Sequence, residues 1–196
     1  MMQREDTGMM EALIDHAHHH PLGWPCRMRI CGQYEARQYV DLWQPTHLVS
    51  IKQRERPYRG PPFPAERHLV LEFEDVTDAS HPGAPTNAHL DAVLTFIDAV
   101  PQEACVLIHC LQGLSRSTAL AMGLLAREVQ PLRAAYLLHG LRPQAVPNPL
   151  LVRLWDERLD LHGELAKEGA RFPCQVWRHG DGLGNFPHRR RKRSHQ

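Results

Sequence analysis

The sequence predicts an α/β fold with a mainly parallel central sheet flanked by helices. Short apolar runs typical of buried strands alternate along the chain with amphipathic segments typical of helices. Clusters of proline and glycine separate many of these runs and mark loops. A length of 196 residues suits one domain with one sizeable core. We therefore expect a single layered domain.

Four segments are predicted as strands. Each is short and mostly apolar, and each is followed by polar or turn-forming residues. The last segment is fully apolar, which is typical of a central strand that is buried on both faces. In chain order the predicted strands are Arg27–Cys31, His47–Lys52, His68–Phe73 and Ala104–Ile108.

Five helices are predicted from apolar periodicity and from end signals. After Thr86, a suitable N-cap, apolar residues recur at helical spacing until Pro101 ends the pattern. Asn148 and Pro149 form an N-cap and first-turn pair for one long helix that ends near Gly169. The remaining predicted helices are Glu35–Leu42, Ser117–Val129 and the segment from Pro131 to Gly140.

Charge and cysteine content narrow the class of protein. There are 23 basic and 22 acidic residues, so the net charge is +1, which argues against a dedicated nucleic-acid binder. Five unevenly spaced cysteines do not fit a disulfide scaffold and suit a reducing compartment. The first 25 residues hold no continuous apolar stretch that could serve as a secretory signal, and no run in the sequence approaches the roughly 18 apolar residues of a membrane span. We therefore expect a soluble, cytoplasmic protein.

The two ends of the chain differ from its middle. Residues 1–25 are polar and rich in histidine, and we interpret them as an N-terminal extension. Residues 26–170 hold all the predicted strands and helices. Residues 171–196 lack periodicity and end in a basic run, RRRKR at 189–193, so we expect a flexible, solubilising tail.

The stretch His109–Ser117, HCLQGLSRS, carries the chemistry. Cys110 follows a buried strand, and Arg116 opens a helix six residues later. Gly113 helps the residues between them to form a tight loop, whose backbone N–H groups point inward at a helix N-terminus and can bind an anion. Arg116 adds donors that match phosphate oxygens. This positive field favours the thiolate of Cys110 over the thiol.

This stretch resembles HCxxGxxRS, the signature of the cysteine-dependent protein tyrosine phosphatases. The chain resembles most closely the small dual-specificity-like branch of that family and its bacterial relatives. The resemblance covers roughly residues 27–165 and includes a later segment, RPQAVPNP, at 142–149. It implies a phosphatase domain over residues 26–170, with the phosphate loop between a central strand and a helix. It implies no metal and no cofactor.

The resemblance also implies a role for each residue of the signature. Cys110 is the nucleophile and forms a phosphocysteine intermediate. Ser117 eases the departure of the Cys110 thiolate in the second step. His109 orients the loop through hydrogen bonds. Arg116 and the backbone amides of the loop hold the phosphoryl group. The phosphate-binding residues are Leu111, Gln112, Gly113, Leu114, Ser115 and Arg116.

The reaction also needs an acid that protonates the leaving oxygen. In the family this acid is an aspartate on the loop that follows an earlier strand, here the strand that ends at Phe73. Three carboxylates stand on that loop: Glu74, Asp75 and Asp78. Asp75 lies where the strand should emerge at the catalytic edge, so it is our first choice. Asp78 is the second.

The expected partner is a phosphorylated protein. The variable positions of the loop are uncharged, which favours a singly phosphorylated group such as phosphotyrosine. Basic residues within 52–59 could rim the pocket and attract acidic substrates. Alternatives are a phosphoinositide, a nucleotide or an RNA 5′ end as substrate, a phosphate-binding pseudophosphatase, and a sulfur or arsenate transfer protein. Cys31 and Cys105 could protect Cys110 as a reversible disulfide.

Overall fold

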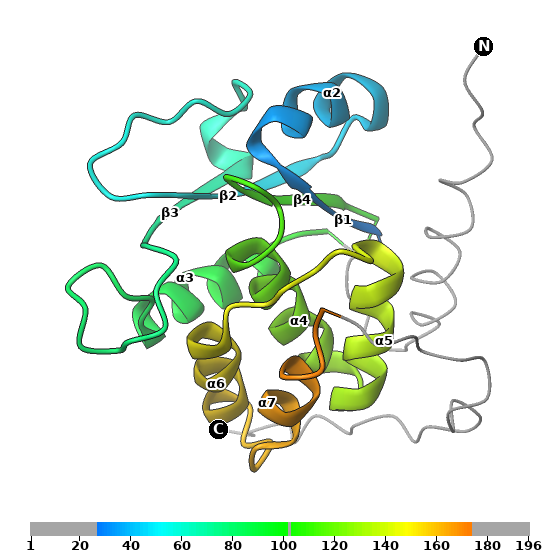
Figure 1. Ribbon diagram of the computed structural model, residues 1–196. Helices are drawn as coiled ribbons and strands as arrows, with labels where there is room; N and C mark the ends of the chain where they lie inside the picture. Colours follow the sequence, from blue (N-terminus) through cyan, green and yellow to red (C-terminus); the bar gives the residue numbers. More distant parts are fainter. Residues whose placement is uncertain (1–26, 102, 174–196) are drawn as a thin grey trace, which may run out of the picture.

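The computed structural model describes residues 27–101 and 103–173, and most of the predicted N-terminal extension and basic tail lies outside them. A four-stranded sheet crosses the molecule with helices on both faces (Figure 1). The strand order is β1-β4-β2-β3, and every pair is parallel. The predicted α/β fold is therefore confirmed. The strands are β1 (Arg27–Gly32), β2 (His47–Lys52), β3 (His68–Glu72) and β4 (Cys105–Cys110).

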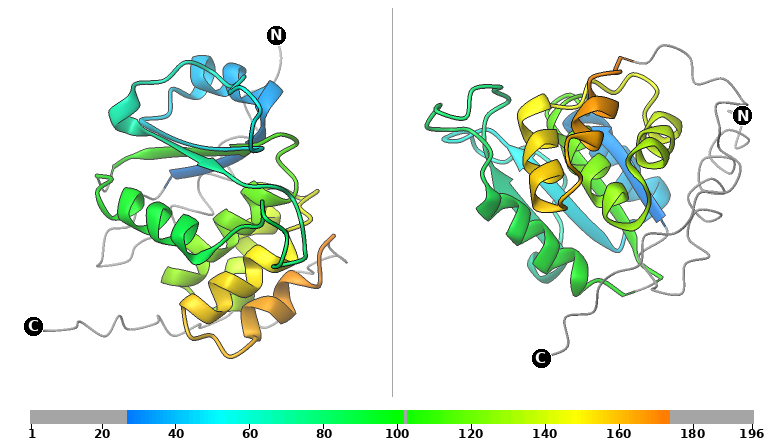
Figure 2. Two further views of the ribbon diagram at one scale, coloured as in Figure 1. Left: turned by 90° about the vertical axis from the view of Figure 1, so that its left-hand side faces the viewer. Right: turned by 90° about the horizontal axis from the view of Figure 1, so that it is seen from below.

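The helices form two unequal layers. The helix α2 (Gln33–Trp43) covers one face of the sheet, and the other α-helices of the described part cover the opposite face (Figures 1 and 2). None of the helices in this part of the chain is long and apolar enough to cross a membrane. The thicker layer holds α3 (Asn87–Asp98), α4 (Arg116–Glu128), α5 (Pro131–Leu141), α6 (Pro149–Arg158) and α7 (Glu164–Gly169), while a short 3₁₀ helix, η1 (Ala65–Arg67), precedes β3.

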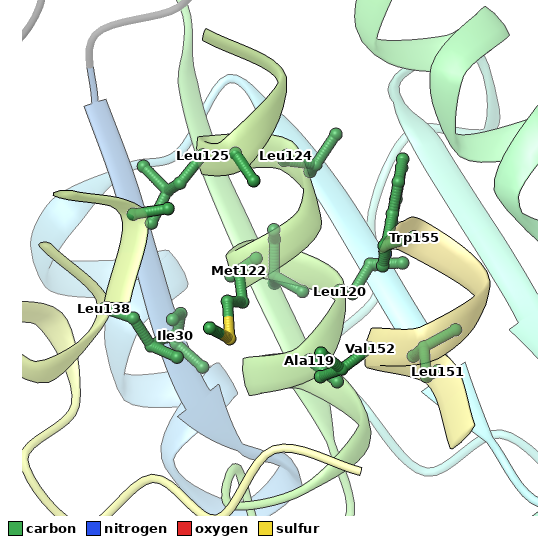
Figure 3. Close-up of a cluster of buried hydrophobic side chains, with 14 of the residues drawn as sticks. Ile30, Ala119, Leu120, Met122, Leu124, Leu125, Leu138, Leu151, Val152 and Trp155 are labelled. Atoms are coloured by element: carbon green, nitrogen blue, oxygen red, sulfur yellow. The ribbon is translucent and has the colours of Figure 1, made fainter. Parts of the chain in front are cut away.

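The main core lies between the sheet and α4. Nearly every side chain of α4 is buried, because α5 and α6 flank this helix on the side away from the sheet. Leu120, Met122 and Leu124 are fully buried, as is Trp155 of α6 (Figure 3). Gly123 lets the Trp155 ring approach, since an added Cβ would lie 2.1 Å from that ring. Each fully buried large apolar side chain contributes about 1.5–3 kcal/mol, so this packing fixes α4 firmly on the sheet.

The prediction of one long helix from Asn148 to Gly169 is wrong. The chain leaves α6 after Arg158 and starts again as α7. Asp156 causes the break, because its buried carboxylate accepts hydrogen bonds from the backbone amides of Gly163 at 2.6 Å, Leu165 at 2.7 Å and Ala166 at 3.0 Å. These amides belong to the first turn of a new helix, and a carboxylate there satisfies donors that otherwise lack a partner.

All four strands end at the same edge of the sheet, since they are parallel. β4 ends at Cys110, between the ends of β1 at Gly32 and of β2 at Lys52. β3, on the far side of β2, ends at Glu72, just before the loop that carries the candidate acids. Ligands of open parallel sheets bind at this edge. The fold therefore brings the signature loop and the acid loop together.

Candidate functional site

The loop between β4 and α4 depends on Gly113. This residue has φ 72°, in the left-handed region that favours glycine. A Cβ atom there would lie 2.4 Å from both the Cys31 carbonyl carbon and the Gly32 nitrogen, which are backbone atoms of β1. No other residue fits both requirements. Gly113 is therefore needed to fold the loop back against the sheet.

The carbonyl groups of the loop are bound by segments outside it. Leu111 O accepts from the Gln33 amide at 3.0 Å, and Leu114 O accepts from the Val146 amide at 2.8 Å. Gly113 O accepts from Arg142 Nε at 3.1 Å. Because these carbonyls turn outward, the loop amides are left for the inside of the loop. Among the described residues the Gly113 amide finds an acceptor there, Cys110 Sγ at 3.3 Å.

Cys110 lies at the base of the loop and is 2% exposed. Its Sγ is 3.2 Å from the hydroxyl of Ser117, in the first turn of α4. The sulfur therefore has two donors within reach, the Gly113 amide and the Ser117 hydroxyl, and it sits beside a helix N-terminus. Each of these groups stabilises negative charge on sulfur.

Arg116 is the first residue of α4 and is 3% exposed. Its Nη1 donates to the carbonyl of Phe73 at 2.9 Å, which fixes the guanidinium against the end of β3. Its Nε is buried and has no hydrogen-bond partner in the described structure. A buried donor without an acceptor is costly, so a charged donor in this state indicates a site for an anion.

Asp75 faces the same pocket. Its Oδ1 accepts from the Ser115 hydroxyl at 2.7 Å and from Asn148 Nδ2 at 2.8 Å. Its Oδ2 lies 3.8 Å from Arg116 Nε, and the carboxylate side chain is 38% exposed. The lining of this pocket brings Asp75 together with Cys110, Arg116 and their neighbours: Gln53, Leu111, Gln112 and Ser115.

Asp78 is placed differently. Its Oδ1 accepts from the Ser80 amide at 2.9 Å and from the Ser80 hydroxyl at 2.8 Å, and it does not line the pocket. The hydrogen bond from the Ser80 amide is the main cause that holds the pKa of Asp78 below its usual value. The structure thus brings Asp75 to Cys110 and Arg116 and leaves Asp78 in a solvent-exposed turn.

His109 lies on the face of the sheet opposite to Cys110. Burial lowers its pKa to about 4, so its ring is neutral at physiological pH. Its Nδ1 lies 3.4 Å from the carbonyl of Cys110, and its Nε2 lies 2.7 Å from Ser50 Oγ. A neutral ring that donates from Nδ1 accepts at Nε2. His68 Nε2, at 2.8 Å, and the Tyr58 hydroxyl, at 3.2 Å, extend this network from Ser50.

Three supporting residues were missed by sequence reasoning. Asn148 was predicted only as a helix cap, yet besides capping Leu151 it binds Asp75 and the carbonyl of Val76. Arg142 pairs with both carboxylate oxygens of Glu35, at 3.1 and 2.8 Å, while it holds the loop. The one signal in the sequence was the segment at 142–149, which contains Arg142 and Asn148.

The other described cysteines are not placed to form a disulfide with Cys110. Cys105 begins β4 and Cys110 ends it, a separation of about 16 Å along an extended strand, beyond the reach of a disulfide. Cys31 packs in the small core under α2, whereas Cys110 belongs to the main core on the opposite face. Burial, followed by the charge of Glu35, raises the pKa of Cys31 far above its usual value, so it remains a thiol.

Comparisons with known proteins place the fold. No family model matches the sequence, and no curated protein matches it significantly. Solved structures do match. The human tyrosine phosphatase-like serine/threonine/tyrosine-interacting protein is 21% identical to this chain, with a TM-score of 0.55. Human DUSP28 is 22% identical, also with a TM-score of 0.55. Each of these two alignments covers 69% of this chain and 92% of the other chain. The Yvh1 phosphatase domain from Chaetomium thermophilum is 20% identical, with a TM-score of 0.53 and coverage of 70% and 93%. The chain therefore has the fold of tyrosine and dual-specificity phosphatases.

Proposed function

We propose that this protein is a cysteine-dependent phosphatase that hydrolyses phosphomonoesters, with phosphotyrosine in proteins as the preferred group. The observation that carries the proposal is Arg116, whose buried Nε makes no hydrogen bond within the described part of the chain and has only the Asp75 carboxylate, at 3.8 Å, as an ionic neighbour in the pocket that holds Cys110. A phosphate dianion between this guanidinium and the loop amides satisfies the free donors. It also places phosphorus next to a sulfur nucleophile.

In the first step the Cys110 thiolate attacks phosphorus and the P–O bond to the leaving group breaks. Charge that develops on the transferred phosphoryl oxygens is stabilised by Arg116 and the loop amides. Asp75 gives its proton to the leaving oxygen, which departs as a neutral alcohol or phenol. The Oδ1 atom of Asp75 is held by Ser115 and Asn148, so Oδ2 is the atom available to carry the proton.

In the second step water attacks phosphorus and the S–P bond breaks. Asp75, now a carboxylate, accepts a proton from the water, and inorganic phosphate leaves with the oxygen of water. The leaving thiolate is stabilised by the Ser117 hydroxyl, 3.2 Å from Sγ, and by the Gly113 amide. Asp75 is then protonated again and Cys110 is again a thiolate, so the enzyme returns to its starting state and the net reaction consumes one water molecule.

The preference for phosphotyrosine in a protein rests on the walls of the pocket. The lining side chains of the loop are Leu111, Gln112 and Ser115, none of which is charged. Leu111 is 38% exposed at the rim, where it offers an apolar surface to an aromatic ring. A reactive cysteine must stay reduced, so we further propose that the protein works in the cytoplasm.

A phosphate-binding module without turnover is the main rival. One neighbour in fold is named as an interacting protein, and the same pocket could capture phosphate without chemistry. The pair of Cys110 Sγ and Ser117 Oγ favours an enzyme, because a hydroxyl aimed at the sulfur serves the departure of a thiolate and adds nothing to binding of a phosphate. The nucleophile and the facing acid, Asp75, are both present.

Hydrolysis of a small aryl phosphate in the presence of a metal chelator tests the proposal. We expect the wild-type protein to be active and Cys110→Ser to have no detectable turnover. Asp75→Ala should retain activity that is lower by about 10²–10⁴-fold, the usual contribution of an acid. Asp78→Ala is the matched control and should match the wild type, because Asp78 is outside the pocket.

Three results would contradict this account. Activity of the Cys110→Ser protein would show that Cys110 is not the nucleophile. Phosphate binding by a wild-type protein that has no activity would favour the interaction module. An impaired Asp78→Ala together with an unaffected Asp75→Ala overturns the choice of acid. Rates on phosphotyrosine peptides, phosphoinositide vesicles, nucleotides and 5′-phosphorylated RNA then rank the substrate classes.

A further inference from the structure

A second hollow opens beside the pocket of Cys110, and we call it the basic trough. It is lined by residues of α2, of the end of β2 and the loop after it, and of the phosphate loop, among them Tyr34, Lys52, Gln53, Arg56, Arg59 and Leu111. Gln53 and Leu111 line the Cys110 pocket as well. A substrate bound at Cys110 that extends past these two residues therefore reaches the trough.

The cations of the trough are not equivalent. Lys52 is paired with Glu72, Nζ to Oε1 at 2.6 Å. Arg56 and Arg59 have no carboxylate within ion-pair distance among the described residues, and no aspartate or glutamate lines the trough. Two guanidinium groups with uncompensated charge thus face one hollow. Arg54, from the same loop, lies outside it and donates instead to the carbonyl of Pro82 at 2.8 Å.

The structure holds this loop in place before any ligand binds. Lys52 Nζ donates to the carbonyl of Arg56 at 3.2 Å, and the Arg56 amide reaches the carbonyl of Gln53 at 3.4 Å. Tyr58 is anchored inward, where its hydroxyl lies 3.2 Å from Ser50 Oγ and donates to the carbonyl of Pro61 at 3.1 Å. Arg56 and Arg59 therefore lie on a loop that is already held in place near Tyr58. Less freedom of the loop is lost when an anion binds, which lowers the entropy cost of binding.

The phosphate loop itself offers one charged side chain, Arg116, to the reacting phosphate. Any other negative group on the substrate must be met elsewhere on this surface, and the trough is the adjoining site with free positive charge. Its rim also carries Tyr34, which is 86% exposed, and the half-exposed Leu111. Exposed aromatic and aliphatic side chains next to arginines suit a peptide, which has both apolar and acidic side chains.

We propose that the basic trough binds an acidic side chain of the substrate, so that the preferred substrates are peptides with a carboxylate or a second phosphate near the phosphotyrosine. This inference rests on the proposed function for its biological meaning. The free anion-binding groups are the guanidinium groups of Arg56 and Arg59. Gln53 and Leu111 form the shared wall between the two subsites.

Binding is measured on the full-length Cys110→Ser protein, so that turnover is not required. The ligands are fluorescent phosphotyrosine peptides. The reference peptide has alanine on both sides of the phosphotyrosine, and each other peptide has one aspartate or one phosphoserine at one of the three positions before or after it. The best acidic peptide should bind about tenfold more tightly than the alanine peptide, since each exposed charge pair contributes about two- to fivefold. This ratio should shrink from about 0.05 M to about 0.5 M salt.

Arg56→Gln combined with Arg59→Gln should bring the ratio close to one. Arg67→Gln is the matched control and should keep it, because Arg67 is a half-exposed arginine of η1, at the opposite edge of the sheet from the pocket. Tighter binding of the aspartate peptides, of the phosphoserine peptides or of both supports the trough and identifies its anion. Equal affinities for all peptides overturn it.

Two further results separate this inference from the proposed function. If the wild-type protein hydrolyses aryl phosphate but the acidic peptides bind no more tightly than the alanine peptide, the trough is contradicted and the proposed phosphatase activity is supported. Protein that shows the preference without hydrolysis supports the trough and contradicts the enzyme. Binding to vesicles with a phosphoinositide, but to none of the peptides, overturns the peptide class.

Discussion

Replacement of Asn148 by alanine should affect both the stability and the chemistry of this protein, because one side chain serves both. Asn148 Oδ1 caps α6 through the Leu151 amide at 3.0 Å. Its Nδ2 donates to the carbonyl of Val76 at 3.1 Å and to the carboxylate of Asp75 at 2.8 Å. The side chain therefore links a helix end to the loop that carries the candidate acid.

The magnitudes follow from these contacts. Loss of a cap costs about 1 kcal/mol, and loss of the hydrogen bond to Val76 about another 1 kcal/mol. The contact with Asp75 adds less, because that carboxylate is 38% exposed and screened by water. Asn148→Ala should thus lower the free energy of unfolding by about 2 kcal/mol, which corresponds to about 4–8 °C in Tm.

Asn148→Ser separates the two roles. Serine is a good N-cap, so this variant should recover about 1 kcal/mol relative to Asn148→Ala. Its hydroxyl is too short to replace Nδ2 at Asp75, so both variants should lose a similar part of kcat. The loss should be larger on phenyl phosphate than on p-nitrophenyl phosphate, because the poorer leaving group depends more on the acid.

Urea unfolding and steady-state kinetics on the two substrates measure these effects. If both variants keep the wild-type kcat on phenyl phosphate, Asn148 does not position Asp75 and the link between cap and chemistry is refuted. If serine restores no stability over alanine, the cap contributes less than its geometry indicates.

Two further predictions concern stability. Gly113→Ala should lower the free energy of unfolding by more than about 2 kcal/mol and abolish activity, because it adds a backbone clash to a left-handed φ. Gly163 also has a positive φ but faces open space, so Gly163→Ala should cost about 1 kcal/mol and remain active. Similar losses of stability for the two variants in urea unfolding would contradict this. The pKa of His109 is about 4 in the folded protein and about 6.5 in the unfolded chain. The neutral side chain therefore contributes its full stabilisation above about pH 6.5, and this contribution should be lost as the pH falls from 6.5 toward 4, because the unfolded chain takes up the proton first. The loss should reach about 3 kcal/mol near pH 4 and be absent from His109→Asn, and equal pH profiles of the two proteins would refute it.

The strands could be predicted closely because their signal is local. β2 agrees at both ends with the predicted segment, and β1 and β3 differ by one residue at an end. The long C-terminal helix was predicted wrongly for a related reason. Apolar residues continue at nearly helical spacing through Leu161 and Leu165, which are both buried, while the break depends on the hydrogen bonds of Asp156. Periodicity alone does not contain that information.

In the candidate site, too, local features could be predicted from the sequence and long-range contacts could not. The candidate nucleophile Cys110, the loop that follows it and Arg116 lie within nine consecutive residues, so they could be predicted together from the sequence. The residues that hold the loop come from far along the chain. Glu35 and Arg142 are 107 positions apart, and Asn148 reaches Asp75 across 73. No local pattern reports such contacts, because only the parallel sheet and the packing of α5 and α6 bring them together.

The covalent step is tested most directly by trapping the intermediate. Full-length Ser117→Ala protein is mixed with an aryl phosphate, quenched in acid and examined by intact mass and peptide mapping. Loss of the hydroxyl beside Sγ should slow the second step, so one phosphate per chain should accumulate on Cys110. The double variant Cys110→Ser and Ser117→Ala should carry none. Turnover without any phosphorylated Cys110, or phosphate on another residue, would contradict catalysis through a phosphocysteine.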